Sequence, residues 1–344
     1  MAYTNIDKPT DYFNTKLYTG NGSTQSITGV GFQPDWIWGK NRSGANAHWV
    51  NDVIRGVDIR LVPNATDAED NPGTDIVTSF DSDGFSLGSN TEGNANANNY
   101  VSWNWKAGGT ASSNTSGSIT STVSANTTSG FSIVSYTGNG SAGATIGHGL
   151  GVSPSWIVTK KRSATGSWVV YHKSQGATKF GILDTTASFG TSSSLWNDTE
   201  PTSSVFSVGT DADTNGSSAT FIAYCFAEKK GFSKFGSYTG NGNADGTFVY
   251  TGFKPAFVLQ KCTSTSTDWT LADNKRPGYN ETNKRLVPNE SASEATNNAI
   301  DFLSNGFKCR QDQANANGSG ETYIYMCFAE NPFVTSTGIP TTAR

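Results

Sequence analysis

The pentapeptide YTGNG occurs three times in this chain, at residues 18–22, 136–140 and 238–242. A recurring landmark at domain-length spacing requires each copy to adopt the same local structure, so the repeat is considered before any single motif. A second landmark follows each copy, with the pattern Gly-x-x-Pro-x-aromatic-apolar-x-x-Lys. Its prolines are Pro34, Pro154 and Pro255, and its lysines are Lys40, Lys160 and Lys261. Matching landmarks lie about 100 to 120 residues apart, which is a domain length rather than a solenoid period.

Composition and local pattern favour β-structure in every copy. Gly, Ser, Thr and Asn are abundant, whereas the good helix formers Leu, Met, Lys and Glu are scarce. In GFSIVSYTGNG successive side chains before the turn would face opposite sides of a strand. The Asn-Gly pair that follows favours a tight turn. YTGNG is therefore predicted to end the first strand, and the Gly-x-x-Pro segment to begin the next. The predicted fold class is all-β, with three tandem jelly-roll-like β-sandwich domains of roughly seven to nine strands each.

The repeat and the composition shifts divide the chain into six parts. These are an N-terminal arm 1–15, sandwich repeat 16–108, a Ser/Thr-rich linker 109–129, sandwich repeat 130–230, sandwich repeat 231–334 and a C-terminal tail 335–344. Two interpretations of the linker stay open: a flexible connection, or partly a strand lying on a neighbour. The joint at 228–237 is short and carries Phe232 and Phe235, which predicts a packed and fixed connection.

Charge and hydropathy argue against several partners. Charged residues make up 15% of the chain and the net charge is −4, without a basic stripe, so nucleic acid is not an expected partner. No apolar run of signal-peptide or membrane-helix length occurs, so neither export nor membrane insertion is expected. The four cysteines lie in apolar or alternating runs without a Cys-x-x-Cys pair, which predicts buried thiols and not a disulfide framework or a zinc site.

Little in the sequence points to catalysis. There is no Gly-x-Ser-x-Gly elbow and no Walker loop, and none of His48, His148 and His172 has a partner at metal-ligand spacing. Glu228 and Glu330 occupy matching positions, but the first copy has Ala107 there. A carboxylate pair for glycoside hydrolysis that meets only in space stays open. The chain is predicted not to be an enzyme and to need no cofactor.

One loop has the beginning of a calcium-binding motif. The stretch DADTNGS at residues 211–217 matches Asp-x-Asp-x-Asn-Gly, with Asp211, Asp213 and Asn215 as candidate ligands. The glutamate expected six residues after the glycine is absent, because Ile222 stands there. A polar hairpin tip is the simpler interpretation, and a weak Ca²⁺ site is the alternative.

The tryptophans raise the hypothesis of a sugar-binding platform. Trp36 and Trp38 share one strand face, as do Trp103 and Trp105, which is more typical of a core. Trp49, Trp168 and Trp269 recur in the three copies, which also favours a role in the fold. Trp196 is the best candidate for an exposed aromatic. We therefore predict a glycan site at Trp196, Asn197 and Asp198.

The recurring cations receive a simple interpretation. The lysine that ends each Gly-x-x-Pro strand is expected to reach solvent. The stretch RLVPN occurs at residues 60–64 and 285–289, with TKFGILD at the middle position. Its arginine is predicted to be a solvated charge at a strand end. A pocket for an acidic sugar or a contact between subunits is the alternative.

Several longer stretches resemble an uncharacterised family of virion structural proteins found in marine bacteriophages. They include YTNIDKPTDYFNTKLYTGNG at the start, SGFSIVSYTGNG and IGHGLGVSP in the middle, and FIAYCFAE and YIYMCFAENPF near the ends of the second and third copies. The resemblance extends over nearly the whole chain. It implies a structural protein of the virion, on the tail or another exposed appendage, and carries no catalytic or binding residues with it.

Three functions are compatible with these observations. The leading hypothesis is a tail-associated or fibre-like virion protein, assembled in the host cytoplasm, that contacts host surface glycans. Its partners would be other virion proteins and copies of itself, with a trimer as the expected assembly. The alternative is a capsid-surface decoration protein without a ligand. A polysaccharide-degrading enzyme, with two facing carboxylates, is the least favoured.

Overall fold

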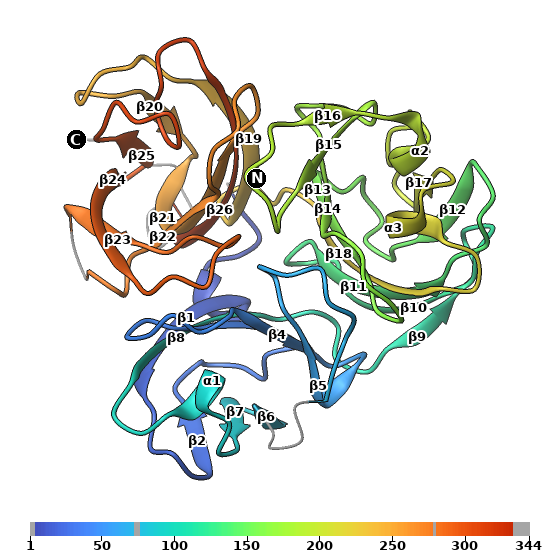
Figure 1. The fold of residues 1–344 in the computed structure, drawn as a ribbon, viewed down its shortest axis with the longest axis horizontal. Helices are drawn as coiled ribbons and strands as arrows, with labels where there is room; N and C mark the ends of the chain where they lie inside the picture. Colours follow the sequence, from blue (N-terminus) through green and yellow to red (C-terminus); the bar gives the residue numbers. More distant parts are fainter. Residues whose placement is uncertain (1–3, 72–75, 278–279, 333–344) are drawn as a thin grey trace.

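The computed structural model describes residues 4–71, 76–277 and 280–332, and its regular secondary structure is almost entirely β-strand. The all-β prediction is confirmed. The strands form three units, each with two antiparallel sheets, and Figure 1 shows the units around a common centre. We call the sheet that contains the last strand of a unit its large sheet and the other its small sheet, although both have four strands in the third unit. The predicted tail 335–344 and residues 1–3 of the predicted arm lie outside the described residues.

The first unit pairs a sheet of order β1-β8-β3-β4-β5 with one of order β2-β7-β6. The large sheet contains β1 (Phe13–Thr19), β3 (Trp36–Asn41), β4 (Trp49–Asp52), β5 (Gly56–Leu61) and β8 (Asn99–Trp105). The small sheet contains β2 (Gln25–Thr28), β6 (Val77–Asp81) and β7 (Gly84–Leu87). The short helices are η1 (Pro9–Asp11), before the unit, and α1 (Thr91–Asn94), before its last strand.

The second unit pairs a sheet of order β16-β15-β14-β13-β18-β11-β10-β9 with the two strands β12-β17. The large sheet contains β9 (Ser112–Asn114), β10 (Ser121–Asn126), β11 (Phe131–Thr137), β13 (Trp156–Lys161), β14 (Val169–His172), β15 (Lys179–Ile182), β16 (Gly190–Thr191) and β18 (Thr220–Phe226). The small sheet contains β12 (Ala144–Gly147) and β17 (Val205–Val208). The helices are α2 (Ser193–Trp196) and α3 (Ala212–Asn215).

The third unit pairs a sheet of order β19-β26-β21-β22 with one of order β20-β25-β24-β23. The large sheet contains β19 (Ser233–Thr239), β21 (Phe253–Cys262), β22 (Thr270–Asp273) and β26 (Thr322–Pro332). The small sheet contains β20 (Phe248–Tyr250), β23 (Thr282–Arg285), β24 (Ala295–Leu303) and β25 (Gly306–Cys309). When strands are counted from the one that carries YTGNG, which is β1, β11 or β19, the first strand of every unit pairs with the last, the last with the third, and the third with the fourth. The strands β9 and β10 are additions to the second unit. The repeat in sequence is therefore a repeat in topology.

Each YTGNG motif fastens the first strand of its unit to the loop before the last strand. In the second unit Asn139 donates its backbone N–H to the side-chain oxygen of Asn215 at 2.9 Å. The Asn215 amide donates to the carbonyls of Ser141 and Gly209, at 2.9 and 2.7 Å. Buried asparagines make the matching bonds in the other units, and these are Asn94 and Asn317.

The tyrosine and the first glycine of the motif belong to the same junction. Tyr136 donates its hydroxyl to the carbonyl of Thr214 at 2.7 Å. A Cβ on Gly138 would lie 2.5 Å from the carbonyl oxygen of Gly216, so only glycine allows the loop to approach this closely. The recurrence of YTGNG is thereby explained by structure alone, because every unit needs the same junction between its first and last strands.

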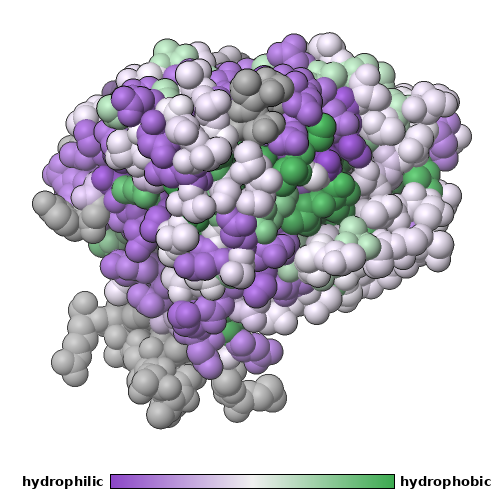
Figure 2. Space-filling view, turned by 90° about the horizontal axis from the view of Figure 1, so that it is seen from below, coloured by the Kyte–Doolittle hydropathy of each residue, from purple (hydrophilic) through white to green (hydrophobic). Residues whose placement is uncertain are grey.

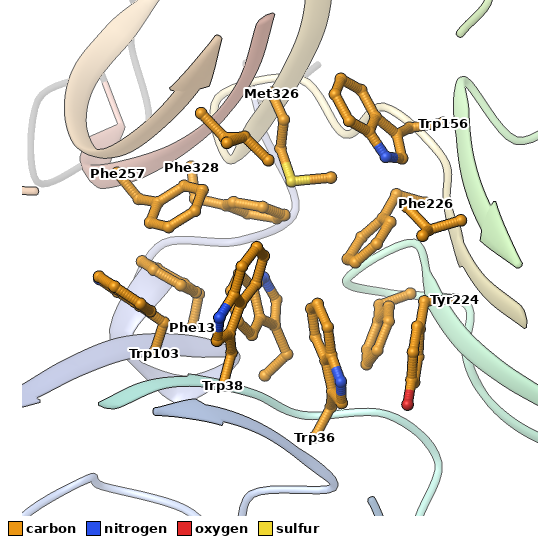
Figure 3. Packing of buried hydrophobic residues seen from close by; sticks show 14 of the residues in the cluster. Phe13, Trp36, Trp38, Trp103, Trp156, Tyr224, Phe226, Phe257, Met326 and Phe328 are labelled. Carbon is orange, nitrogen blue, oxygen red and sulfur yellow. The ribbon is translucent and has the colours of Figure 1, made fainter. Parts of the chain in front are cut away.

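One buried cluster at the centre of the molecule takes residues from all three large sheets. Figure 3 shows aromatic side chains from different units pointing toward one another there. Phe13 stacks on Phe328 across the first and third units, with ring centroids 5.0 Å apart, and Trp36 stacks on Tyr224 across the first and second at 4.6 Å. The opposite face of each large sheet packs on its own small sheet. The central strands of each large sheet, such as β3 and β13, are therefore buried on both faces.

Equivalent polar contacts close the three units into a ring. Trp168 of the second unit donates its ring N–H to the carbonyl of Val62 in the first, at 2.9 Å. His48 stands at the matching place in the first unit, and its Nε2 lies 3.1 Å from the carbonyl of Val287 in the third. Trp269 of the third unit donates its ring N–H to the carbonyl of Ile182 in the second unit, at 2.9 Å. Each unit thus contacts the one before it, and the first contacts the third.

The prediction that Trp49 matches Trp168 and Trp269 is wrong by one position. The strand registers place Trp49 level with Val169, so His48 is the true counterpart of the other two residues. A step of one residue turns a strand side chain to the opposite face of the sheet. Trp49 consequently packs against the small sheet of the first unit and not into the centre.

The lysine that ends each Gly-x-x-Pro strand is buried, so the prediction that it reaches solvent is wrong. Lys40 is 0% exposed, and its ammonium donates to the carbonyl of Asn46 at 2.8 Å and, in the third unit, to that of Ser291 at 3.0 Å. In the same way the Lys160 ammonium donates to the carbonyl of Thr66, and the Lys261 ammonium donates to the carbonyl of Thr186, each at 2.8 Å. Burial lowers the pKa of all three lysines to about 8. The repeated lysine is thus a contact between units.

Two of the three interfaces also contain a buried ion pair. Arg55 donates to Asp52 at 2.6 Å, and the same aspartate oxygen accepts the hydroxyl of Tyr224 from the second unit at 2.8 Å. At the interface of the third and first units, Arg276 donates to Asp273, and the same aspartate oxygen accepts the ring N–H of Trp103. Between the second and third units, His172 takes the place of the aspartate, and burial lowers its pKa to about 3. The ring is therefore closed by three contacts that are not identical.

The connections between units are ordered parts of the fold. Residues 109–129 contain β9 and β10, and β10 pairs with β11, which agrees with the second interpretation of the linker. Phe232 and Phe235 are each 1% exposed within the central cluster. The prediction of a packed joint between the second and third units is confirmed.

Replacing Lys40 by Met should lower the free energy of unfolding by about 3 kcal/mol, because several buried carbonyl groups lose their donor. Urea unfolding followed by tryptophan fluorescence measures this change. The control is Lys179→Met, at an exposed lysine, for which we expect a change below about 0.5 kcal/mol. Equal effects in the two variants would contradict the structural role of Lys40.

Acidification should weaken the interface at His172. The pKa of this imidazole is about 3 in the folded chain, against 6.5 for an ordinary histidine, so only the unfolded chain takes up the proton between these values. Stability is therefore lost as the pH falls below about 6.5, by about 2 kcal/mol at pH 5. Urea unfolding at pH 8 and pH 5 should show a smaller difference for His172→Gln than for the parent. An unchanged pH dependence in that variant would contradict the assignment.

Candidate functional site

The structure places Trp196 inside the second unit, so the predicted exposure of this residue is wrong. Its side chain is 2% exposed and packs edge-on against Tyr171 and Phe206, with ring centroids 6.0 and 6.5 Å apart. Asn197 is half-buried and Asp198 is exposed, and both have positive φ at the end of α2. A ring in this position cannot stack on a sugar.

The residues of the predicted calcium loop are engaged in other contacts. Asp211 accepts the backbone N–H of Asp213 at 2.8 Å and caps the single turn α3. Asp213 pairs with Lys161 at 3.2 Å, and Asn215 is the buried asparagine of the YTGNG junction. Among the described residues, no group of three or more His, Cys, Asp or Glu side chains could hold a metal ion. The weak Ca²⁺ site stays a prediction.

The other candidate aromatics are part of the fold. Trp36, Trp38, Trp103 and Trp105 lie in the central cluster, which confirms the core interpretation. Figure 2, which views the molecule from the side of the first unit, shows a surface that is mostly hydrophilic or neutral, with apolar residues gathered near the middle of the view and in smaller spots on either side. The large apolar residues exposed within the described ranges are Val152, Phe248 and Tyr250.

The buried titratable side chains also serve the structure. His148 accepts the N–H of Leu150 through Nδ1 at 3.2 Å, and desolvation lowers its pKa. The four cysteines are free and buried, as predicted, and burial raises the pKa of Cys225 well above its ordinary value. A buried thiol with a raised pKa is a poor nucleophile.

A polar pocket of about 350 Å³ opens in the third unit and is the best candidate for a ligand site. It lies where β21 begins and β26 ends, beside the loop that leads from β22 to β23. Its lining residues are Lys254, Asn274, Lys275, Asn280, Thr282, Phe302 and Glu330.

Some of these side chains form a fixed wall. Lys254 and Glu330 pair at 2.8 Å across neighbouring strands. The Asn280 amide donates to the carbonyl of Phe302 at 2.7 Å and its oxygen accepts the N–H of the same residue at 2.9 Å. Reciprocal bonds of this kind hold the loop against β24, so this side of the pocket is preorganised.

Two groups in the pocket remain available to a ligand. The side-chain oxygen of Asn274 is buried and has no hydrogen-bond partner within the described residues. Lys275 is exposed, and its ammonium makes no hydrogen bond or ion pair in that same part of the chain. An acceptor and a cationic donor beside a carboxylate suit a ligand with several hydroxyl groups.

The sequence of the loop beside this pocket is longer in the third unit than in the first. Eight positions separate Asp52 from Arg60 in the first unit, whereas twelve separate Asp273 from Arg285 in the third. Sequence reasoning missed the pocket because it sought residues that recur. The longer loop was the signal that could have indicated it.

The chain belongs to the family described as Domain of unknown function (DUF7483), which it matches over residues 8–332. That range includes all three units. Neither the curated proteins nor the solved structures include a match to this chain. None of the helices in residues 4–71, 76–277 and 280–332 is long and apolar enough to cross a membrane.

Replacing Trp196 by Ala should lower the free energy of unfolding by about 3 to 5 kcal/mol, as expected when a large buried aromatic side chain is removed. The comparison is Ser203→Ala in the exposed loop that follows, which should change stability by less than about 0.5 kcal/mol. Thermal unfolding measures both. A stable Trp196→Ala variant would show that the ring is not part of the core.

Proposed function

We propose that the chain is a structural protein of a bacteriophage virion, tail-associated or fibre-like, and that the pocket of its third unit contacts a host surface glycan. The observation that carries the glycan part is the pair of unengaged polar groups, Asn274 and Lys275, beside the fixed Lys254–Glu330 pair. The virion part rests on the resemblance of the repeated stretches to marine phage proteins.

The architecture is consistent with a building block. We propose that the three units are copies of one jelly-roll-like β-sandwich domain, supported by their shared strand order. Direct pairing of β3 with β4, and of its counterparts, is a departure from a regular jelly roll. A block with a shared core would hold the pocket in a fixed orientation on a particle assembled in the host cytoplasm.

We propose binding and not catalysis as the activity of the pocket. Glu330, the one carboxylate among the described lining residues, is paired with Lys254, and glycoside hydrolysis requires two carboxyl groups facing the bond that is cut. A second candidate function is capsid-surface decoration without a ligand. The closed arrangement of the three units favours this second function, because a rigid protein can stiffen the capsid lattice without binding a ligand.

A glycan array with the purified chain, followed by calorimetric titration of the best binder, tests the glycan part. Lys275→Ala and Asn274→Ala should each weaken binding at least tenfold, because each removes one of the available polar groups. Lys179→Ala, at an exposed lysine of the second unit, should bind like the parent.

The absence of any array binder, or equal affinity in all variants, would contradict the glycan part and leave decoration as the better candidate. Cryo-electron microscopy of intact particles tests the virion part independently. Density for the chain on the tail would support the leading proposal, and density flat on the capsid lattice would support decoration.

A further inference from the structure

Strand β20 leaves an open edge on the small sheet of the third unit. It is the terminal strand of the order β20-β25-β24-β23. Thr247 and Thr251 bond to the β25 hairpin, so the backbone groups of Phe248 and Tyr250 point away from the sheet. These outward groups have no hydrogen-bond partner within the described residues. Open edges of this kind are templates for pairing with another strand.

The side chains at the same two positions are large and apolar. Phe248 is 45% exposed and Tyr250 is 51% exposed, while Val249 between them is buried at 6%. The ammonium of Lys234 lies 5.4 Å from the centre of the Tyr250 ring. Natural sheet edges are more often protected by small or charged residues, so two aromatics on an open edge indicate a surface that is covered in use.

The second unit shows that this edge of the fold accepts a strand. The counterpart of β20 is β12, and the chain's own residues cover it: Ile119 forms a parallel bridge with Ile146 and donates its N–H to the carbonyl of Thr145 at 2.9 Å. Ser121 donates its hydroxyl to the carbonyl of Gly147 at 2.7 Å. Thr145 and Gly147 are the counterparts of Phe248 and Tyr250.

In the first unit no backbone group of a described residue bonds to the outward side of this edge. Its edge strand β2 has Ser26 and Thr28 at the two outward positions, and both are exposed. The three units therefore present the same edge in three forms: polar and open, covered by the chain itself, and aromatic and open. Only the third form leaves apolar surface in water.

We propose that β20 pairs antiparallel with β20 of a second copy of this chain, about a two-fold axis through Val249. The edge is complementary to itself under this operation, because Phe248 of each copy comes opposite Tyr250 of the other. One step satisfies the outward backbone groups of both residues and covers four aromatic rings. The proposal does not depend on the glycan pocket.

Sedimentation equilibrium of the full chain tests the proposal. We expect a monomer–dimer equilibrium that the double variant Phe248→Ser, Tyr250→Thr weakens at least tenfold. These substitutions introduce the residues that the first unit has at the same positions, so the fold tolerates them. The control is Val152→Ser, which removes a similarly exposed apolar residue elsewhere and should leave the equilibrium unchanged.

A chain that stays monomeric at every concentration, or a dimer that the double variant does not weaken, overturns the proposal. Val249→Cys tests the register, because the two-fold axis brings this residue opposite its own copy. The native cysteines are buried within their own units, whereas the introduced thiol lies directly across the dimer interface from its copy, so oxidation of the dimer should yield one disulfide-linked species. A dimer that fails to cross-link through this residue overturns the pairing as well.

Discussion

The central aromatic cluster is the interaction on which the rest of the structure depends. A β-sandwich normally buries one face of each sheet and leaves the other in water. Here each large sheet buries its second face against the other two units. That face carries residues such as Trp36 and Phe328, so a unit separated from its neighbours would expose them. The buried lysines, the ring-nitrogen contacts and the packed joint all follow from closing this centre.

The sequence predicted the strands and turns within each copy, but it did not predict the contacts between copies. The class of fold, the end of the first strand at YTGNG and the packing of Phe232 could be read from pattern and composition. The burial of Lys40 could not, because its partner Ser291 lies in another unit. His48 was not recognised as the counterpart of Trp168, because the shared property is a ring nitrogen and not a residue type. Trp196 was misplaced because helix α2 is too short to have a pattern.

The candidate sites lie where the threefold arrangement no longer constrains the chain. Toward the centre a substitution must fit two neighbouring units, and the matching positions Trp36, Trp156 and Phe257 all hold an aromatic residue there. On the outer side the residues of a unit contact solvent and not another unit, and there the third unit differs from the others. Its longer loop contributes Asn274 and Lys275 to the pocket, and its edge strand carries Phe248 and Tyr250. Pattern matching across copies therefore finds the scaffold and overlooks the sites.

The ring has three interfaces but only two covalent junctions, since the contact between the first and third units is closed without a peptide link. The same arrangement could be built by three separate copies of one short chain. In such an assembly a mutation at one interface would appear at all three. Joining the copies in a single gene removes that restriction, which is why two interfaces can hold an aspartate–arginine pair while the third holds His172. Fusion thus turns a symmetric assembly into one whose parts can evolve separately.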